Sequence, residues 1–484
     1  MNSDILVRIG REEFRNLERL LFRRYPEEEW ATFAKFGWRE SSQGLVLTLA
    51  EVDPPKLGEL DESVGHVAIQ EPYTLRVALA AEKHSLAVGV LHSHPDKCEP
   101  RPSSVDDDMD GYYSEYFSTF AAGRPYASLI LARMHDGEIA ISGRIFWRRE
   151  WLPVSRFLVE CQPVKTWTRQ SWVVDGFRER TARLASAFGK RAAARLRTSS
   201  VAVIGAGGTG SAAIEVLVRA GVGRIVIVDP DHITESNLER VHGSHPSDIE
   251  QRLSKAALAR NHALAIDPAC SINAYQGAIP QSEIVDAITT CDLVLGCTDQ
   301  QHSRLALSDI ANRYLVPSID CGVALEGKNG KITGQIVQLV RFLSADPCAL
   351  CREMINPIRV AEELMSAEDR VVRQAEAQAA AKRGEDPNPY WQGVPQLNTV
   401  GYLTTMAGAM AAGYAIGWLT GSFDPPFSRL QMNLGAPLLE VQEVTQEPRS
   451  YCSCRRARGW ADQGSADALI SAPAHWPPAH LVAW

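Results

Sequence analysis

The stretch VAVIGAGGTGS, Val201 to Ser211, decides the fold of the second half of this 484-residue chain. An apolar run leads into glycines at positions 205, 207 and 210, and a helical stretch follows. The run RIVIVD, Arg224 to Asp229, comes next and has the composition of a second strand. A strand, a glycine loop, a helix and another strand in this order begin a βαβ unit. The sequence therefore predicts a parallel α/β sheet in this part of the chain.

The glycine loop has the spacing of a nucleotide phosphate site. Gly205, Gly207 and Gly210 stand between strand and helix, where backbone N–H groups and the helix N-terminus face an anion. Asp229 closes the next strand, where its carboxylate could bind a ribose hydroxyl. These residues alone fit an NAD-dependent dehydrogenase as well as an ATP-dependent enzyme.

The residues that follow distinguish these possibilities. IVDPDHITESNLER (residues 227–240), Lys255 and LVLGCTD (residues 293–299) together resemble the ThiF/MoeB/E1 family, which adenylates the C-terminal carboxylate of ubiquitin-like proteins. The resemblance implies that ATP and Mg²⁺ are bound here. It assigns the ribose to Asp229, the ATP phosphates to Asn237, Arg240 and Lys255, and Mg²⁺ to Asp299. Cations suit this reaction because attack on an α-phosphate builds charge on the leaving pyrophosphate.

Two further features of the same family have counterparts in the chain. RTAR, Arg180 to Arg183, stands where the family has an arginine pair that contacts the phosphates from the partner subunit, so the resemblance implies a homodimer; a solvated helix face is the alternative. CALC and CSC match the family's structural zinc clip, with ligands Cys348, Cys351, Cys452 and Cys454. The second pair departs from the usual C-x-x-C. Four thiolates would make a closed tetrahedral zinc site.

A second candidate metal site lies in VLHSHPDKCEPRPSSVDDDM, Val90 to Met109. On a strand, His92 and His94 would point to the same side. A carboxylate about a dozen residues later could complete a three-ligand zinc site that leaves one position for water, as catalytic sites do. Taken alone, a histidine pair at a strand end can also be incidental.

The context of this pair resembles the zinc isopeptidase signature of the JAB (JAMM/MPN+) family over about Ile5 to Pro153. HSHP followed by SSVD carries the resemblance. It implies zinc ligands His92, His94 and Asp106, with Ser103 hydrogen-bonded to the tetrahedral intermediate. The loop is one residue longer than the commonest spacing, which leaves Asp107 as a second candidate ligand.

The same resemblance implies a general base from the region PEEEWATF. Glu28 is the first candidate, because Ala31 and Phe33 follow it as the family pattern prefers, and Glu29 is the second. A solvated acidic turn is the alternative. With a base, the site would hydrolyse an amide or isopeptide bond.

These motifs predict an α/β chain with two modules. A JAB-type α/β metalloprotease domain is expected at 1–153, a linker at 154–175, a Rossmann-like E1/ThiF adenylation domain at 176–456, and a poorly ordered or partner-docked tail at 457–484. Apolar spacing predicts a helix within Arg8 to Arg24, and short strands follow it. A charged alanine-rich segment at 360–386 and an Ala/Gly-rich helix at 401–419 come later.

Composition limits the possible partners. A net charge of −8 without clustered Lys and Arg argues against nucleic-acid binding. No apolar window approaches a membrane span, and the N-terminus lacks the order of a signal peptide, so we expect a cytoplasmic protein without membrane association.

The function predicted from the motifs is bifunctional and belongs to a bacterial ubiquitin-like pathway. One half would adenylate a ubiquitin-like protein ending in Gly, and the other would cleave that protein from a precursor or conjugate. Residues 352–399 contain no cysteine, so the adenylate would pass to an E2-like partner; Cys321 is a further candidate nucleophile. The alternatives are a sulfur-carrier activating enzyme with a carrier-processing JAB domain, and a binding scaffold with degenerate sites.

Overall fold

The computed structural model describes residues 4–24, 28–63, 66–94, 99–135, 137–162, 164–166, 179–393, 399–436, 438–464 and 468–482. The chain divides into two compact units. The first comprises Met1–Val174, Asn312–Leu315 and Ser453–Asp467, and the second comprises Asp175–Ala311, Val316–Cys452 and Ala468–Trp484. Among the described residues, no helix is long and apolar enough to cross a membrane.

The first unit is built on a mixed sheet with strand order β10-β1-β3-β2-β6-β7-β8-β11, and β9 pairs with β8. These strands are β1 (Asp4–Ile9), β2 (Ala31–Ser41), β3 (Gly44–Asp53), β6 (Ala87–Ser93), β7 (Tyr126–Arg133), β8 (Ile139–Trp147), β9 (Glu150–Pro153), β10 (Arg156–Val159) and β11 (Lys165–Thr166). A separate hairpin joins β4 (Leu60–Ser63) to β5 (His66–Ile69). The helices are α1 (Arg11–Leu21), α2 (Glu71–Lys83), α3 (Ser104–Phe120) and α14 (Ser453–Arg456).

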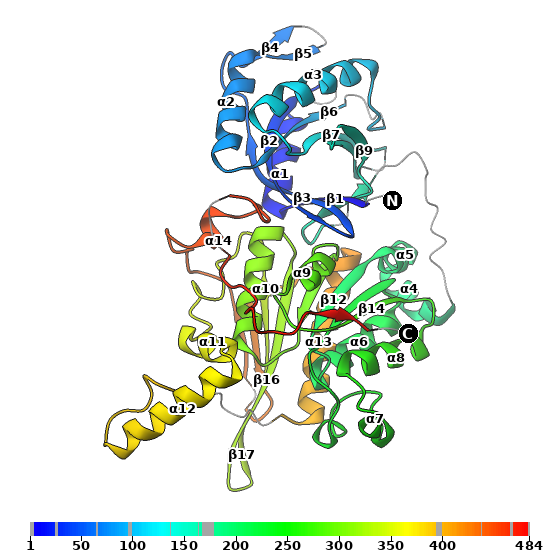
Figure 1. Cartoon of the computed structure of the whole chain (residues 1–484). Helices are drawn as coiled ribbons and strands as arrows, with labels where there is room; N and C mark the ends of the chain where they lie inside the picture. The colour runs from blue at the N-terminus through cyan, green and yellow to red at the C-terminus, as the bar shows by residue number, and fades with distance from the viewer. Residues whose placement is uncertain are drawn as a thin grey trace. The chain divides into compact units, whose positions relative to one another are not determined.

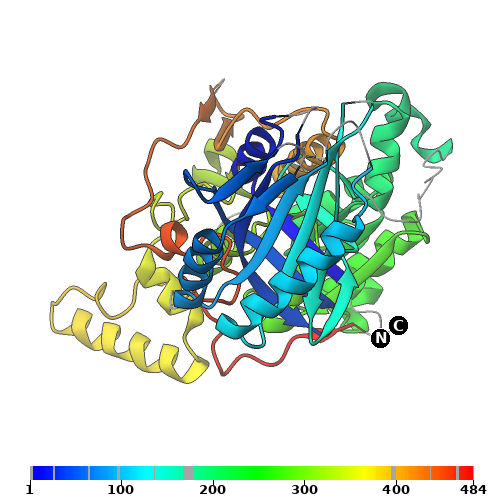
Figure 2. The same ribbon diagram turned by 90° about the horizontal axis from the view of Figure 1, so that it is seen from above.

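Helices cover both faces of this sheet. The apolar stripe of α1 places Phe14, Leu17 and Leu21 in one core with Leu91 and other strand residues. The opposite core contains Phe33 together with aromatic residues of α2 and α3. Figures 1 and 2 show α2 and α3 next to each other, and the two helices are in contact. Alternate residues of each strand therefore enter different cores, as the strand period requires.

The second unit is a Rossmann-type α/β layer structure with strand order β19-β18-β17-β16-β15-β12-β13-β14-β20. Its strands are β12 (Ser200–Ile204), β13 (Arg224–Val228), β14 (Ser271–Gln276), β15 (Leu293–Gly296), β16 (Ser318–Lys328), β17 (Lys331–Phe342), β18 (Arg429–Asn433), β19 (Leu438–Gln442) and β20 (His480–Leu481). The central strands, β14-β13-β12-β15-β16, are parallel, whereas the strands on either side of them pair antiparallel. The buried, β-branched runs of β12 and β13 are typical of a parallel sheet with both faces covered.

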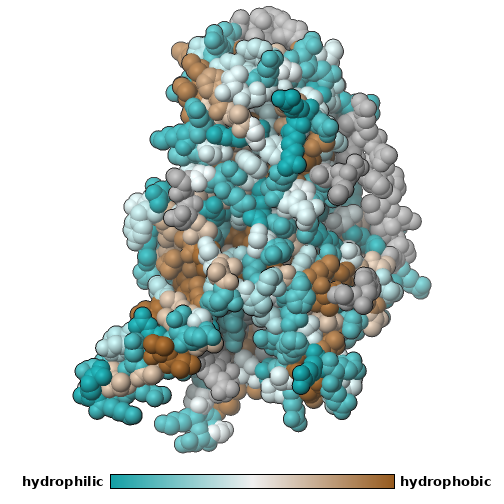
Figure 3. Space-filling view, in the orientation of Figure 1, coloured by the Kyte–Doolittle hydropathy of each residue, from teal (hydrophilic) through white to brown (hydrophobic). Residues whose placement is uncertain are grey.

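The α-helices of the second unit are α4 (Ala182–Phe188), α5 (Lys190–Thr198), α6 (Gly208–Ala220), α7 (Pro246–Glu250), α8 (Lys255–Ile266), α9 (Ser282–Ile288), α10 (Gln301–Tyr314), α11 (Pro357–Leu364), α12 (Ala367–Lys382) and α13 (Gly401–Thr420). The Ala- and Gly-rich sequence of α13 lets it lie close to α6, and a Cβ on Gly408 would meet the Thr209 carbonyl at 2.2 Å. By contrast, α12 is largely exposed. Figure 3 shows an apolar patch on this helix, which carries the exposed Val371 and Val372.

The structure differs from the sequence expectations at three places. Residues 4–9 form strand β1, which was not expected, whereas α1 lies within the range expected for a helix. The expected linker begins with β10, which pairs with β1, and continues to β11, which pairs with β8. The end of the expected adenylation domain and the start of the expected tail, within Ser453–Asp467, belong to the first unit, and β20, also in the expected tail, pairs with β14 of the second. In each case the missed element is a short segment held by pairing with distant residues.

Candidate nucleotide-binding site and metal centres

The glycine loop joins β12 to α6 at the carboxyl end of the parallel strands. Gly205 has φ +94, a conformation that favours glycine. A Cβ on Gly210 would stand 1.8 Å from the Gly205 carbonyl oxygen, so that position accepts no side chain. Gly207 is the N-cap of α6. The free N–H groups at the start of this helix are suited to an anion.

Asp229 fixes the loop from the neighbouring strand end. Its carboxylate accepts hydrogen bonds from the backbone N–H of Ala206 at 2.7 Å and of Asp231 at 2.9 Å. The side chain is 5% exposed, and this burial raises its pKa although the charge of Lys255 and the two hydrogen bonds oppose the shift. Asp229 therefore shapes the loop, and its bond to a ribose stays a prediction.

A cavity of about 420 Å³ opens beside the glycine loop. Seven of the residues expected at the nucleotide site line it: Gly205, Gly207, Asp229, Asn237, Arg240, Lys255 and Asp299. Asn237 is held by accepting hydrogen bonds from the backbone N–H and hydroxyl of Thr234. The Nζ atom of Lys255 forms an ion pair with Asp231 Oδ2 at 2.8 Å. The fold thus collects segments far apart in sequence around one cavity.

The arginine pair expected from a partner subunit lies elsewhere. The Arg180 guanidinium pairs with Asp267 at 2.8 Å and donates to the Ile266 carbonyl at 2.7 Å, both within this chain. Arg183 is exposed on α4 and does not line the cavity. A phosphate contact made from one protomer to another stays a prediction for both arginines.

Sequence reasoning missed several residues that line the cavity. Arg304, on α10, donates from Nε to Asp320 at 2.6 Å, and the charge of buried Asp320 raises the arginine pKa. Glu363 accepts hydrogen bonds from the first backbone N–H groups of α10, at Gln301 and His302. The position of Arg304, five residues after Asp299, is only a weak sequence signal that it belongs to the cavity. Glu363 gives no sequence signal of this kind, because its partners lie about sixty positions away in sequence.

Two thiols meet at the wall of the same cavity. The Sγ atoms of Cys297 and Cys321 lie 3.5 Å apart, and Cys321 also donates to the Gly296 carbonyl at 3.2 Å. The contact with Cys297 and burial raise the pKa of Cys321 well above its ordinary value. Since the thiolate is the nucleophilic form, this environment disfavours Cys321 as an acceptor.

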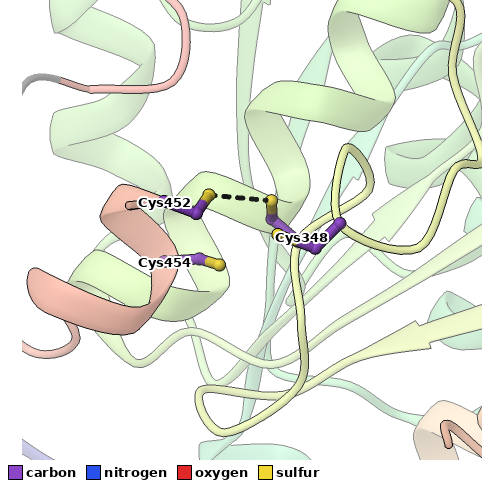
Figure 4. Close-up of side chains that lie close together, drawn as sticks. Cys348, Cys452 and Cys454 are labelled. Atoms are coloured by element: carbon purple, nitrogen blue, oxygen red, sulfur yellow. Dashed lines mark hydrogen bonds between the residues drawn. The ribbon is translucent and has the colours of Figure 1, made fainter. Parts of the chain in front are cut away.

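Four cysteines from two distant segments form a compact cluster: Cys348, Cys351, Cys452 and Cys454. Their sulfur atoms lie within 4.8 Å of one another, and all four residues are buried. Figure 4 shows the sulfurs of Cys348 and Cys452 facing each other, 3.6 Å apart. In a tetrahedral zinc–thiolate site, Zn–S bonds of about 2.3 Å place the sulfurs about 3.8 Å apart. The donor set therefore fits zinc. The C-x-C pair spans the start of α14 at Ser453, and both of its sulfurs still reach the cluster.

We expect Cys348→Ser to lower the free energy of unfolding by more than about 2 kcal/mol, because a closed metal site is formed by folding. Zinc content should fall, and a chelator should destabilise the parent protein more than the variant. Thermal unfolding and metal analysis would measure both effects. Cys161→Ser, outside the cluster, is the control and should change little. Unchanged stability and zinc content in Cys348→Ser would contradict the assignment.

The second candidate centre lies in the first unit at the end of β6. His92 and His94 point their Nε2 atoms toward each other at 3.3 Å, and Asp106 on α3 approaches them at 3.0 and 3.7 Å. These donor atoms lie within 4.8 Å of one another. Hydrogen bonds to the histidines help to hold the pKa of Asp106 far below its usual range despite burial. Two imidazoles and a carboxylate are the donor set of many catalytic zinc sites.

The other residues expected at this zinc site differ in their surroundings. Asp107 pairs with Arg144 at 2.6 Å, whereas Asp106 is the carboxylate that lies against the histidines, and its role as a zinc ligand stays a prediction. Ser103 is the exposed N-cap of α3 and forms a capping box with Asp106. Glu28 is exposed and pairs with Arg24 at 2.7 Å. The negative charge of Glu29 instead contributes to raising the pKa of His94 against the effect of burial. Of the two glutamates, Glu29 is therefore the one whose charge acts on a candidate ligand.

Residues 179–455 match the model of the ThiF family, which is more than half of the chain, and the chain belongs to this family. "Adenylyltransferase and sulfurtransferase UBA4" of Eremothecium gossypii is 31% identical over 163 residues, 34% of this chain and 35% of that protein. "Probable molybdopterin-synthase adenylyltransferase" of Porphyra purpurea is 37% identical over 115 residues, 24% of this chain and 30% of that protein. These matches span about a third of the relatives' length.

Among solved structures, the chain is similar to E. coli MccB crystallised with succinimide, at 16% identity and a TM-score of 0.43. That match covers 58% of this chain and 76% of MccB. The family assignment rests on the second unit, and the JAB resemblance of the first unit stays a prediction.

Proposed function

We propose that this protein is an ATP-dependent adenylyltransferase that activates the C-terminal carboxylate of a small ubiquitin-like carrier. The observation that supports this most directly is the single cavity in which the glycine loop, Arg240, Lys255 and Asp299 meet. A dehydrogenase builds no charge on a leaving pyrophosphate, so its reaction has no need for two cations and a Mg²⁺-binding carboxylate there. A nucleotide triphosphate with Mg²⁺ does have that need.

In the proposed reaction, a carboxylate oxygen of the carrier forms a bond to the α-phosphorus of ATP, and the bond to the pyrophosphate oxygen breaks. Negative charge builds on the leaving pyrophosphate. Arg240 and Lys255 supply positive charge for it, and Asp299 would hold Mg²⁺ against the same oxygens. Arg183 would reach the phosphates of a second copy in a homodimer.

The relatives favour a sulfur carrier as the substrate over the conjugation pathway expected from the sequence. Their names describe sulfurtransferase and molybdopterin-synthase adenylyltransferase activities, and none of those quoted names a conjugating enzyme. The absence of cysteine in residues 352–399 and the protonated, buried thiol of Cys321 support direct transfer from the adenylate to a partner's nucleophile. An E2-like partner remains the less supported form of that transfer.

We further propose that the first unit is a zinc-dependent hydrolase that processes the carrier. His92, His94 and Asp106 would hold the ion, which supplies a Lewis acid that makes bound water easier to deprotonate. Glu29 would accept the proton and later deliver it to the leaving amine. Ser103, at the N-cap of α3, would donate a hydrogen bond to the substrate oxygen as charge develops there.

Pyrophosphate exchange tests the adenylation. With radiolabelled pyrophosphate and ATP, we expect label to enter ATP only when a ubiquitin-like protein ending in Gly is added, because adenylation is reversible and needs the carboxylate. The same carrier lacking its terminal Gly is the matched control and should give no exchange. NAD reduction by the pure protein, or exchange without any carrier, would overturn the proposal.

A further inference from the structure

We infer that Arg144 is a positioning residue of the candidate zinc site, which it completes by holding α3 so that Asp106 faces the two histidines. Arg144 lies on β8, where it pairs in register with Ser128 of β7, and it contacts neither histidine in any hydrogen bond or ion pair of the described residues. The inference rests on the proposed zinc site.

The guanidinium of Arg144 binds two carboxylates of α3 at once. Nη1 donates to Asp107 Oδ1 at 2.6 Å, and Nε donates to Asp110 Oδ2 at 2.7 Å. The group also lies over the Trp151 ring, 4.9 Å from its centroid. A planar guanidinium held by an aromatic face and two carboxylates has little freedom to move.

These contacts fix the orientation of α3 about its own axis. Asp107 and Asp110 are three positions apart, so they share one face of the helix, and Arg144 binds that face. Asp106 lies one position before Asp107 and four before Asp110, so it borders the face that Arg144 binds, and its Oδ1 reaches His92 at 3.0 Å. Rotation or withdrawal of α3 would break the contact with Arg144 and with His92 together.

The capping box alone does not provide this orientation. Ser103 donates to Asp106 from its backbone N–H at 2.6 Å and from its hydroxyl at 2.7 Å, and both groups belong to the helix start itself. The capping box thus fixes Asp106 within α3, whereas Arg144 ties α3 to the sheet that carries the histidines. β6 pairs with β7, and β7 pairs with β8, so this link is rigid.

Arg144 also balances the charge near the site. Asp110 is 3% exposed, and burial raises its pKa while Ser128 and Arg144 oppose that shift. Without the arginine, a buried carboxylate would lose its ion pair, and such a group moves toward water or becomes neutral. Either response would disturb α3 one turn after Asp106, the candidate ligand.

Zinc affinity of the full-length protein tests the inference. Zinc is titrated in competition with a chromophoric chelator. The cysteine cluster should bind zinc in a separate phase, so the phase that is lost in the His92→Ala variant belongs to this site. We expect Arg144→Gln to weaken that phase about 10- to 100-fold, as loss of a supporting contact does in metal sites. Arg144→Lys, which keeps the charge but not the two-carboxylate geometry, should fall between.

Cobalt substitution supplies a second readout. The visible spectrum of Co²⁺ in this phase should change in Arg144→Gln if the ligand geometry changes. The matched control is Arg148→Gln, because Arg148 comes directly after β8 but pairs with Glu40 at 2.7 Å and is largely exposed. The zinc affinity and cobalt spectrum of this variant should equal those of the parent protein.

Each outcome separates the inference from the zinc site itself. Absence of a His92-dependent phase in the parent protein would overturn the proposed zinc site. Presence of that phase, with unchanged affinity and spectrum in Arg144→Gln, would overturn the role of Arg144 alone. If Arg144→Gln lowers global stability, the double variant Arg144→Gln/Asp107→Asn separates the two effects. Because both residues act through one contact, the double variant should bind zinc no more weakly than Arg144→Gln alone, and a further additive loss would contradict the inference.

Discussion

Asp299→Ala should reduce carrier-dependent pyrophosphate exchange by at least about 100-fold, the size of effect seen when one group that stabilises transition-state charge is removed. Asp299 follows β15 and is exposed in the nucleotide cavity, where its carboxylate can share Mg²⁺ with the ATP phosphates. Magnesium remains bound to ATP in solution without it. The loss should therefore appear in the rate of exchange more than in the affinity for ATP.

The measurement is exchange at saturating ATP over a range of Mg²⁺ concentrations. Asp299→Asn keeps the size of the side chain and removes its charge, so it should be nearly as slow as the alanine variant. Glu283→Ala, an exposed carboxylate at the start of α9 that does not line the cavity, is the control. Exchange by Asp299→Ala within about threefold of the parent rate would exclude a Mg²⁺ role for this residue.

The geometry of the candidate nucleotide site was predictable because its residues are constrained locally. The glycines at 205 and 210 are required by backbone conformation and by a 1.8 Å approach, and such requirements leave a sequence signature. Asp229 follows a buried apolar strand, where side chains meet at the carboxyl edge of a parallel sheet. The family resemblance added Asn237, Lys255 and Asp299, which the cavity does bring together.

The missed strands have a different physical origin. β10, β11 and β20 are two to four residues long, and each is held by hydrogen bonds to a strand more than twenty positions away. A segment of that length has too few residues to show a period of two. The expected connector and tail therefore contain strands that no local pattern indicates.

The supporting residues of both sites were hidden for a related reason. Arg144 and Asp107 are thirty-seven positions apart, and Glu363 is sixty-two from Gln301, so only the fold joins them. The choice between Glu28 and Glu29 as general base could not be made from the sequence either. The two side chains are adjacent along the chain, yet one pairs with Arg24 and the other acts on His94.

Glu29→Gln should abolish peptide or isopeptide cleavage by the first unit while zinc remains bound. The amide keeps the shape of the side chain but cannot accept a proton, and removal of a general base costs about 10²- to 10⁴-fold in rate. Glu28→Gln is the matched variant, since Glu28 is exposed and engaged with Arg24, and it should cleave at close to the parent rate. The substrate is a ubiquitin-like protein with a second protein fused after its terminal Gly, and zinc content is measured on the same samples.

The pair of variants distinguishes the possible results. Loss of cleavage in Glu28→Gln with normal cleavage in Glu29→Gln would return the base to the residue first expected from the sequence. Normal cleavage in both would leave the base on another group. Loss of cleavage together with loss of zinc in Glu29→Gln would make Glu29 a contributor to metal binding, because its charge already acts on His94. The expected result, slow cleavage with zinc retained in Glu29→Gln alone, follows if this carboxylate, whose charge acts on His94, accepts the proton and does not bind the ion.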